Sequence, residues 1–411
     1  MPEATAPTPR RILLADADAF YVAVARLLDP EGAAQAELLI VGGAPGSRGV
    51  VCSASYEARA FGVRSGMPMS QAVRLCPRAT CVPVPRRACS EKSRAIRAVM
   101  ERFSPVVAAA SIDEFYLDLT GTERLYDGAS LASVAERIRA AVIAETGLSV
   151  SIGGGTSRLV AKMAAQLAKP RLGSDDPGVF VVEPGGEGAF MRRFTLADIP
   201  GIGPRAQERL RAHGLVTVDD ALAADDASLV RWLGEREAGW LRERVLGVDH
   251  SPVEARAEAK SLSREDTFPV DLHHDADLER ELLRLVVRVA GDLRGDGLRA
   301  RTVTVKLRDA DFTTRQASRT VATPIESDRA IHAVAHELLG KLRRARRTGA
   351  RLLGVTLSSL GAEGYASQLP LFGEAEPPIE TERDRAISRV VDGVRARFGD
   401  AALLPAALKR R

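Results

Sequence analysis

The segment RILLADADAFYVAV, residues 11–24, joins an apolar run to two aspartates and then to two aromatic side chains. A continuous run such as ILL is typical of a strand buried in the core of a sheet. Asp16 and Asp18 stand where this run ends. The segment therefore predicts an internal strand whose end carries carboxylates to the edge of a sheet.

A second acidic pair lies inside the β-type run VVAAASIDEFYLDL, residues 106–119. In a regular strand the side chains of the neighbours Asp113 and Glu114 would point to opposite faces of the sheet. Two carboxylates placed in this way would not help the packing of an apolar core. Pairing this strand with the first would bring Asp16, Asp113 and Glu114 together. Three carboxylates at one place repel each other unless a multivalent cation neutralises them, and oxygen ligands favour Mg²⁺. Such a cluster suits two-metal phosphoryl transfer, and the alternative is a set of solvated acids at strand ends.

Length and composition limit the class of protein. A chain of 411 residues is too long for one core and predicts three or four domains. A hydrophobic content of 45% with 27% charged residues is typical of a folded soluble protein, and no run of 18 apolar residues predicts a membrane span. Four cysteines without zinc spacing predict reduced thiols, and we expect a cytoplasmic protein. A net charge of +4 permits a nucleic-acid partner.

Strand-like runs and helical patterns divide the chain into parts. Residues 11–168 alternate β-type runs with helical patterns, which predicts an α/β or α+β domain. Residues 169–248 lose the strand pattern and predict short helices. The last mixed part has the β-α-β-β-α-β order of a ferredoxin-like domain, with elements expected at 261–270, 275–294, 301–308, 315–322, 327–345 and 351–358.

Phosphate-handling residues follow both acidic segments. Tyr56 and Arg59 are three apart on one predicted helix and could reach the same phosphate group. Lys162 lies on an otherwise apolar helix face, where an uncompensated lysine would be costly. The glycine-rich segments at 42–49 and 153–158 do not match a P-loop, so side chains and metal would hold any triphosphate.

The chain contains, in this order, the motifs DADAFY, SYEARAFGVRSGMPMSQAVRLCP, SIDEFYLDLTG and LVAKMAAQLAKP. Together they resemble the Y-family translesion DNA polymerases, in particular the bacterial DNA polymerase IV branch, over about residues 11–361. The resemblance implies an α+β multidomain, right-hand polymerase with a mixed-sheet palm, small fingers, a helix-hairpin-helix thumb and a ferredoxin-like little finger. The implied divisions are a leader (1–10), palm (11–25 and 79–168), fingers (26–78), thumb (169–248), linker (249–260), little finger (261–361) and tail (362–411).

The resemblance also implies roles for single residues. Asp16, Asp113 and Glu114 would be the catalytic acids and would ligate two Mg²⁺ ions, and the Ala17 carbonyl would also touch one of them. Asp18 belongs to the motif but is not expected to be a primary ligand. The residues expected to hold the triphosphate of the deoxynucleotide are Ser53, Tyr56, Arg59 and Lys162.

Tyr21 would be a steric gate that excludes a ribose 2′-hydroxyl, with Phe20 supporting the pocket. The alternative is that Tyr21 is a core aromatic residue at the start of the first helix. Two departures from the family pattern leave the metal and triphosphate residues in place. Ala25 stands where the family commonly has glutamate, and GGGTSR (153–158) stands where it usually has GVAPNK.

Several features predict contact with primer–template DNA. DIPGIGPRAQERL (198–210) is a helix-hairpin-helix signature, in which Gly201 and Gly203 would let backbone amides approach a phosphate. The little finger supplies basic residues, of which Arg301 and Lys306 are expected to bind DNA. The spacing of His332 and His336 could mimic half a zinc site, but a plain helical role is the better interpretation.

The tail contains the apolar pentapeptide QLPLF (368–372), followed by an amphipathic segment at 382–397. The pentapeptide resembles the bacterial peptide that binds the β sliding clamp, in which its anchors would be Gln368, Leu369, Leu371 and Phe372. We therefore expect an error-prone, monomeric translesion DNA polymerase that adds deoxynucleotides to a primer 3′ end, with DNA, deoxynucleotides and the clamp as partners. The alternatives are a catalytically inactive paralogue that serves as a DNA and clamp adaptor, and another metal-dependent palm enzyme such as a nucleotide cyclase.

Overall fold

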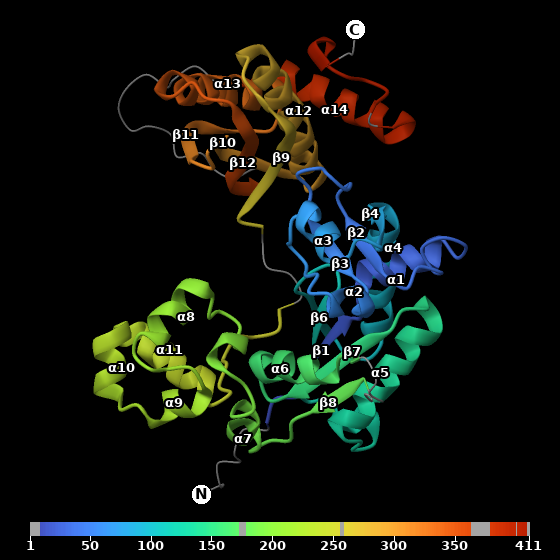
Figure 1. The fold of residues 1–411 in the computed structure, drawn as a ribbon. Helices are drawn as coiled ribbons and strands as arrows, with labels where there is room; N and C mark the ends of the chain where they lie inside the picture. The colour runs from blue at the N-terminus through green and yellow to red at the C-terminus, as the bar shows by residue number, and fades with distance from the viewer. Residues whose placement is uncertain (1–8, 172–177, 255–258, 363–378, 400, 409–411) are drawn as a thin grey trace, which may run out of the picture. The chain divides into compact units, whose positions relative to one another are not determined.

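The structure is a computed structural model that describes residues 9–171, 178–254, 259–362, 379–399 and 401–408 (Figure 1). The chain forms two compact units, residues 1–257 and 258–411, which are described separately. Among the helices of the described residues, none is long and apolar enough to cross a membrane.

A five-stranded sheet forms the centre of the first unit, in the order β5-β6-β1-β7-β8. The central strand β1 (Ile12–Ala17) is antiparallel to β6 (Glu114–Asp118) and to β7 (Val150–Gly155). The strand is buried along its whole length, which confirms the prediction of a core strand from the ILL run. This sheet is the palm of the expected polymerase fold.

Helices cover both faces of the palm sheet. The face that carries Leu13 packs on α1 (Phe20–Leu28), α4 (Arg86–Met100) and α5 (Leu131–Thr146). The face that carries Ile12 and Leu14 packs on α6 (Arg158–Ala168). Because side chains alternate along a strand, Asp16 lies on the same face as Ile12 and Leu14, towards α6. The sheet therefore places this carboxylate beside one particular helix.

The run VVAAASIDEFYLDL was expected to be a single strand, and that prediction is wrong. It folds into a hairpin of β5 (Val106–Ala109) and β6, which are antiparallel partners. The Ser111 hydroxyl accepts the backbone N–H groups of Asp113 and Glu114 at 3.2 and 3.1 Å, which stabilises a turn at this point. Asp113 therefore lies in the turn, and Glu114 begins the second strand.

The fingers contain a three-stranded sheet in the order β3-β2-β4, with two short helices, α2 (Tyr56–Ala60) and α3 (Met69–Leu75). Strand β2 (Leu39–Gly42) pairs antiparallel with β3 (Val51–Ala54) and parallel with β4 (Thr80–Pro83). The sequence assigned the fingers to residues 26–78 and gave residues from 79 onward to the palm. Strand β4 lies beyond that limit and completes the fingers sheet, because its backbone pairs with β2.

The segment 169–248 was expected to contain only helices, and this too needs correction. Strand β8 (Val179–Val181) pairs parallel with β7 and completes the palm sheet. Its three residues are too few to give a periodic signal in the sequence. The helices that follow form one apolar core, and they are α7 (Glu187–Met191), α8 (Pro204–Arg211), α9 (Val218–Ala223), α10 (Asp226–Leu233) and α11 (Glu235–Val245).

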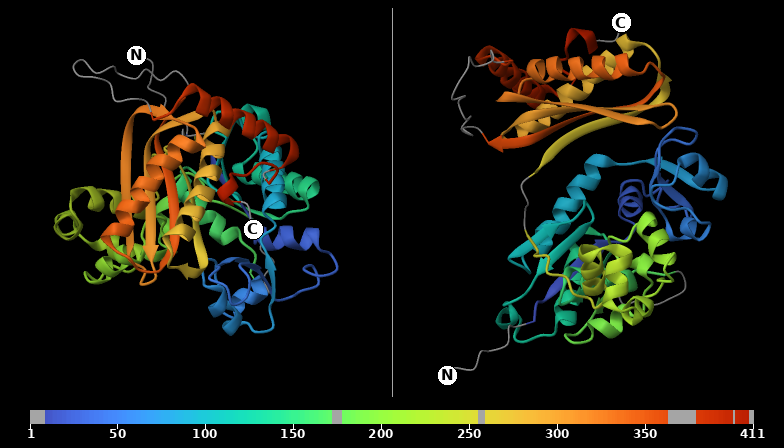
Figure 2. Two further views of the ribbon diagram at one scale, coloured as in Figure 1. Left: turned by 90° about the horizontal axis from the view of Figure 1, so that it is seen from above. Right: turned by 90° about the vertical axis from the view of Figure 1, so that its left-hand side faces the viewer.

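The second unit confirms the predicted β-α-β-β-α-β order. Its strands lie in the order β11-β10-β12-β9 with every neighbouring pair antiparallel, and two helices pack on one face of the sheet (Figure 2). The elements are β9 (Ser261–Leu272), α12 (Asp275–Gly295), β10 (Leu298–Asp309), β11 (Thr314–Ile325), α13 (Asp328–Ala345) and β12 (Ala350–Ala362). Polar residues occupy the face away from the helices, where Thr302 pairs with Thr320, and Thr304 with Ser318.

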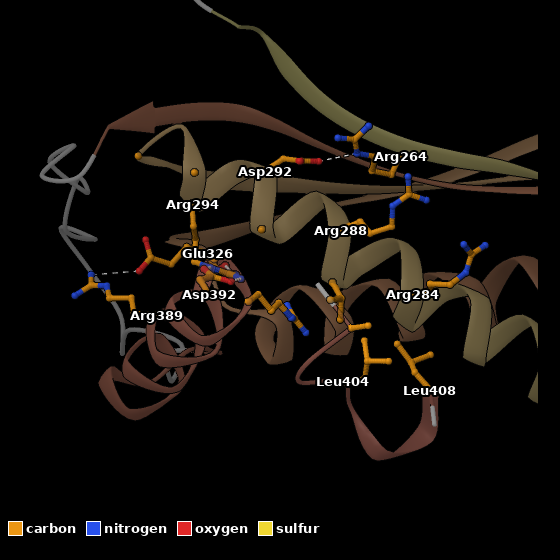
Figure 3. A pocket seen from close by; sticks show the side chains of 17 residues that line it. Arg264, Arg284, Arg288, Asp292, Arg294, Glu326, Arg389, Asp392, Leu404 and Leu408 are labelled. Carbon is orange, nitrogen blue, oxygen red and sulfur yellow. Dashed lines mark hydrogen bonds and ion pairs between the residues drawn. The ribbon is translucent and has the colours of Figure 1, made fainter. Parts of the chain in front are cut away.

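The amphipathic segment of the tail folds as α14 (Glu382–Phe398) and docks on the second unit through its charged side (Figure 3). Arg294, whose side chain is 6% exposed, donates to both carboxylate oxygens of Asp392 at 2.6 and 2.9 Å and to Asp328 at 2.9 Å. The buried Glu380 accepts the backbone N–H groups of Glu326 and Ser327. The ion pair of the buried Arg294 with Asp392 and the hydrogen bonds of Glu380, just before the helix, thus hold this segment against the little finger.

Candidate active site

The predicted acids meet at the end of the central palm strand. Asp16 and Glu114 are directly opposite partners in the register of β1 and β6. The backbone carbonyl of Asp113 accepts the N–H of Ala17 at 2.9 Å, which ties the turn between β5 and β6 to the end of β1. Ser111 also bonds the Asp113 carboxylate. Backbone pairing therefore places Asp16 beside Asp113 and Glu114, which lie almost 100 residues away in the sequence.

Two lysines from the α6 side reach these acids. Lys162, on α6, lies 2.9 Å from both carboxylate oxygens of Glu114. Lys169, which follows the last turn of α6, lies 2.6 Å from Oδ2 of Asp16. The sequence marked Lys162 as a costly lysine on an apolar face, and Glu114 is its compensating partner. Asp16 and Glu114 thus each have their own ammonium partner.

A glycine makes this approach of α6 possible. A Cβ atom on Gly153 would lie 2.1 Å from the backbone nitrogen of Ala165 and 2.2 Å from the carbonyl oxygen of Ala161. Only glycine fits at position 153, the first residue of the segment GGGTSR that departs from the family pattern. Gly153 therefore lets the backbone of α6 lie directly on β7. The close packing sets the position of the lysine on α6 relative to the sheet.

Burial raises the pKa of Asp16 from 3.8 to about 6, although Lys169 opposes this change and Glu114 and Asp113 add to it. Asp16 is 7% exposed, so its charged form is poorly solvated. A buried carboxylate of this kind gains from any bound cation. The electrostatics of the site therefore favour a positive ligand at the end of β1.

The donors at this site are all oxygen atoms, which suit a hard divalent cation better than zinc or copper. In the part of the chain that the structure describes, no three His, Cys, Asp or Glu side chains are grouped closely enough to hold a metal ion. The ammonium groups of Lys162 and Lys169 occupy the carboxylates instead. The donor set fits the expected metal, and a cation would have to replace these two ion pairs.

Asp18 has hydrogen-bond partners that Asp16, Asp113 and Glu114 do not share. Its carboxylate accepts hydrogen bonds from the hydroxyls of Ser149 and Ser151 at 2.7 and 2.6 Å, and its side chain is buried. These two serines lie beside and on β7, so Asp18 links the end of β1 to that strand. This structural role agrees with the expectation that Asp18 is not a primary ligand.

Tyr56, which is expected to hold the triphosphate from the fingers, lies close enough to Asp16 and Asp18 for their charges to affect its pKa. Burial raises the pKa of Tyr56 to about 12, and the charges of Asp18 and Asp16 contribute in the same direction. The guanidinium of Arg59 lies 5.1 Å from the centre of the Tyr56 ring and donates to the Ala54 carbonyl. These two side chains therefore face the same acidic site from α2. Ser53 is buried on β3, and its predicted contact with a triphosphate stays a prediction.

The two aromatic residues at the start of α1 have different environments. Phe20 is buried in the palm core, whereas Tyr21 is only partly buried and packs against it edge to face at 5.6 Å. Desolvation is the main cause that raises the pKa of Tyr21, and the charge of Asp113 is the next. Tyr21 thus borders both the core and the acidic site. Ala25 is buried on the same helix, where a glutamate would need a partner.

Comparison with known proteins gives a consistent result. Residues 15–166 match the model of the impB/mucB/samB family, and residues 259–371 match the model of that family's C-terminal domain. A DNA polymerase IV of Dehalococcoides mccartyi (strain CBDB1) is 38% identical over 349 residues, which are 85% of this chain and 87% of the relative. A DNA polymerase IV of Desulfatibacillum aliphaticivorans is 36% identical over 401 residues, 98% of this chain and 97% of the relative.

This chain belongs to the Y-family DNA polymerases, in the bacterial DNA polymerase IV branch. A solved Y-family DNA polymerase chimera has the same fold, with a TM-score of 0.75 at 24% identity over 86% of this chain and 100% of that chain. The protein is therefore a DNA-directed DNA polymerase of the translesion type. Y-family polymerases use divalent metal ions, which agrees with the oxygen donors described above.

Sequence reasoning gave Lys169 no role in the Y-family site. Lys169 was visible in the quoted motif LVAKMAAQLAKP, but it falls just past the predicted end of the palm at residue 168. Lys169 comes directly after Ala168, the last residue of α6, so the end of the helix sets its position. It does not belong to the apolar periodic face of that helix. The sequence alone did not show that α6 ends at this point and leaves Lys169 within reach of Asp16.

The predicted DNA-binding residues of the polymerase lie on separate elements. Gly201 has φ +100°, and a Cβ there would lie 2.9 Å from Trp240, so the hairpin requires glycine at this position. Gly203 precedes α8, whose N-terminal amides are available to a phosphate. Lys306 pairs with Glu265 at 2.7 Å, and Arg301 is exposed on β10. Their contacts with DNA stay predictions.

The predicted clamp-binding residues, Gln368 to Phe372, lie outside the described residues. The nearest described positions on each side are Ala362, at the end of β12, and Ile379, which packs against the core of the little finger. The predicted pair of histidines, His332 and His336, lies on α13 with ring centres 5.9 Å apart. Among the described residues, no third His, Cys, Asp or Glu joins them to form a group that could hold a metal ion.

Proposed function

We propose that this polymerase extends a primer 3′ end by template-directed, two-metal nucleotidyl transfer, and that it bypasses damaged template bases with low fidelity. The observation that carries the proposal is the register of β1 and β6, which sets Asp16 opposite Glu114 with Asp113 in the adjoining turn. A polymerase palm needs acids at this place, because charge develops on the attacking and leaving oxygens.

The residues that would hold two Mg²⁺ ions are Asp16, Asp113, Glu114 and the carbonyl of Ala17. Bound there, the ions would supply charge stabilisation for the oxygens of the transferred phosphoryl group. Lys162 and Lys169 balance the charge of two of the three acids, since they pair with Glu114 and Asp16. Released from these acids, both ammonium groups are free to bind the phosphate oxygens of the incoming deoxynucleotide.

Tyr56 and Arg59 would hold the triphosphate from the fingers side. The hydroxyl of Tyr56 is protonated at neutral pH and can donate a hydrogen bond to a phosphate oxygen, and the rise of its pKa to about 12 keeps it so at alkaline pH as well. The guanidinium of Arg59 adds a charge-assisted donor next to it. Ser53 would complete the set from β3.

Tyr21 would exclude ribonucleotides by occupying the space of a ribose 2′-hydroxyl. Its position between the palm core and Asp113 supports this role, because a well-packed ring cannot move away without cost. Phe20 supports the gate from the core through their edge-to-face contact. The same burial is compatible with the alternative of a purely structural Tyr21, which the ribonucleotide measurement in the Discussion separates.

The DNA and clamp contacts complete the proposal. The loop at Gly201 and Gly203, together with the basic residues Arg301 and Lys306, would hold the phosphate backbone without reading its sequence. The exposed ion pair of Lys306 with Glu265 contributes little, so a phosphate can compete for the lysine. The pentapeptide at 368–372 would tether a monomeric, cytoplasmic polymerase to the β sliding clamp.

A primer-extension assay tests the proposal directly. An undamaged primer–template with deoxynucleotides should be extended with Mg²⁺ and should not be extended with excess EDTA. Extension that follows the template sequence would support the polymerase. DNA binding without extension would instead support the inactive adaptor, although the chain keeps all three acids that an adaptor would be expected to lose. Product formed from nucleotide alone, without a primer, would indicate another palm enzyme.

A further inference from the structure

The hairpin between β10 and β11 displays an aromatic residue in a strained conformation. Phe312, at the tip of this hairpin, has φ +67° and is 61% exposed. A bulky side chain rarely adopts this left-handed backbone, and such strain persists only where the surrounding structure imposes it. The structure around Phe312 therefore has to hold this backbone in place and leaves the ring open to a ligand.

Buried ion pairs fix the hairpin tip. Asp309 is fully buried, and both of its carboxylate oxygens accept from Arg315, at 2.8 and 3.1 Å. Arg346 donates to Asp309 at 3.0 Å and to the neighbouring Asp311 at 2.7 Å. The backbone closes the turn, since the N–H of Phe312 donates to the carbonyl of Asp309 at 3.0 Å. The ring is thus held outward by a rigid support rather than by a mobile loop.

An arginine lies against one face of the exposed ring. The guanidinium carbon of Arg351, on β12, is 4.5 Å from the centre of the Phe312 ring. Within the described ranges no carboxylate lies within ion-pair distance of Arg351, so its N–H donors remain available. The tip of the hairpin therefore combines an accessible aromatic face with an uncompensated guanidinium.

We propose that Phe312 and Arg351 bind one unpaired nucleotide of a single-stranded DNA segment, such as the template ahead of the primer. The base would stack on the open face of Phe312, and the guanidinium would donate to the phosphate of the same nucleotide. Exposed aromatic rings beside basic groups are the usual platform for single strands, because every base has a π face.

The surroundings of the ring favour nucleic acid over a protein partner. The residues beside Phe312 at the tip, Ala310, Asp311 and Thr313, are exposed and small or polar, so they form no apolar patch of the kind that a protein interface needs. The arginines of the hairpin region outnumber its acids, and Arg315 and Arg346 together balance the charge of Asp309 and Asp311. A base requires only one ring face and a nearby cation, and this site provides both.

The test uses the full-length protein and a fluorescent primer–template with a ten-nucleotide 5′ overhang. Phe312→Asn removes the ring but tolerates the left-handed backbone, so it should fold at least as well as the wild type in a thermal melt. Its affinity for overhang DNA should fall about 5- to 100-fold, the range expected for loss of one stacked base, while blunt-duplex affinity stays unchanged. Phe312→Trp should keep the wild-type affinity.

A matched control and a positional scan sharpen the result. Phe398 is 66% exposed and also carries an arginine, Arg397, over its ring at 5.2 Å, but it ends α14. Phe398→Asn should leave DNA binding unchanged. Abasic sites placed one by one along the overhang should weaken the wild type at one position and leave Phe312→Asn unaffected there. Equal overhang affinity for Phe312→Asn and the wild type, or an equal loss on blunt duplex, would overturn the proposal.

Discussion

Replacing Asp16 by asparagine should stabilise the metal-free protein at alkaline pH while removing one of the proposed metal ligands. Asp16 is 7% exposed, and burial is the largest of the effects that raise its pKa, ahead of the opposing attraction of Lys169. The folded protein therefore holds a proton on Asp16 more tightly than the unfolded chain does. Asparagine has nearly the same shape and carries no charge, so it avoids the cost of ionising a buried acid.

The size of the effect follows from the pKa. A rise from 3.8 to about 6 corresponds to about 3 kcal/mol of stability that is lost as the pH increases through this interval. Well below pH 3.8 the Asp16 carboxyl is protonated in both the folded and the unfolded state, so the penalty is absent. Well above pH 6 it is ionised in both states, and the penalty is complete. At pH 8 the apparent melting temperature of Asp16→Asn should thus exceed that of the wild type by ~6–12 °C.

The assay is thermal unfolding in EDTA between pH 4 and pH 8, with and without subsequent addition of Mg²⁺. The advantage of Asp16→Asn should grow as the pH rises and should shrink when Mg²⁺ is added, because only the wild type regains a full set of ligands. Asp118→Asn, at the other end of β6, serves as the matched control for removing a carboxylate and should not change the response of the protein to added Mg²⁺. If Asp16→Asn is no more stable than the wild type at pH 8 in EDTA, the electrostatic account of the site is wrong.

Three further outcomes are expected. Tyr21→Ala should keep deoxynucleotide insertion and raise the ratio of ribo- to deoxynucleotide incorporation by roughly 10- to 100-fold, and an unchanged ratio in single-nucleotide insertion would remove the gate. Deleting residues 367–372 should leave short-primer extension intact but abolish its stimulation by the clamp, and full stimulation would contradict the peptide assignment. Arg294→Met should cost about 3–5 kcal/mol and expose α14 to hydrogen exchange, because it leaves Asp392 without its partner, and retained protection of α14 would refute this docking.

The sequence identified the elements with the strongest patterns. The ILL run predicted a core strand, and the long helices α12 and α13 were visible from their apolar periodicity. The acids Asp16 and Glu114 were also found, because carboxylates next to apolar runs stand out. Such features depend on local composition, so a single chain reveals them without any knowledge of its three-dimensional contacts.

Features that depend on pairing were harder to predict. The hairpin around Ser111 was taken for one strand, because the bend depends on side-chain bonds to the backbone within an otherwise β-type run. Strand β8 has three residues and exists because β7 offers it a partner. Lys169 was overlooked because its role depends on where α6 ends. In each case the structure depends on a contact that the hydrophobic periodicity of the sequence does not reveal.

The central claim is that the acids at the end of β1 and β6 carry out nucleotidyl transfer. The most direct measurement is the single-turnover rate of nucleotide insertion by Glu114→Gln, compared with the wild type and with Asp118→Asn, alongside DNA binding by fluorescence anisotropy. Glu114→Gln should insert on the order of 10³-fold more slowly or worse, with DNA affinity nearly unchanged, while Asp118→Asn should match the wild type. Insertion by Glu114→Gln at close to the wild-type rate would contradict the account.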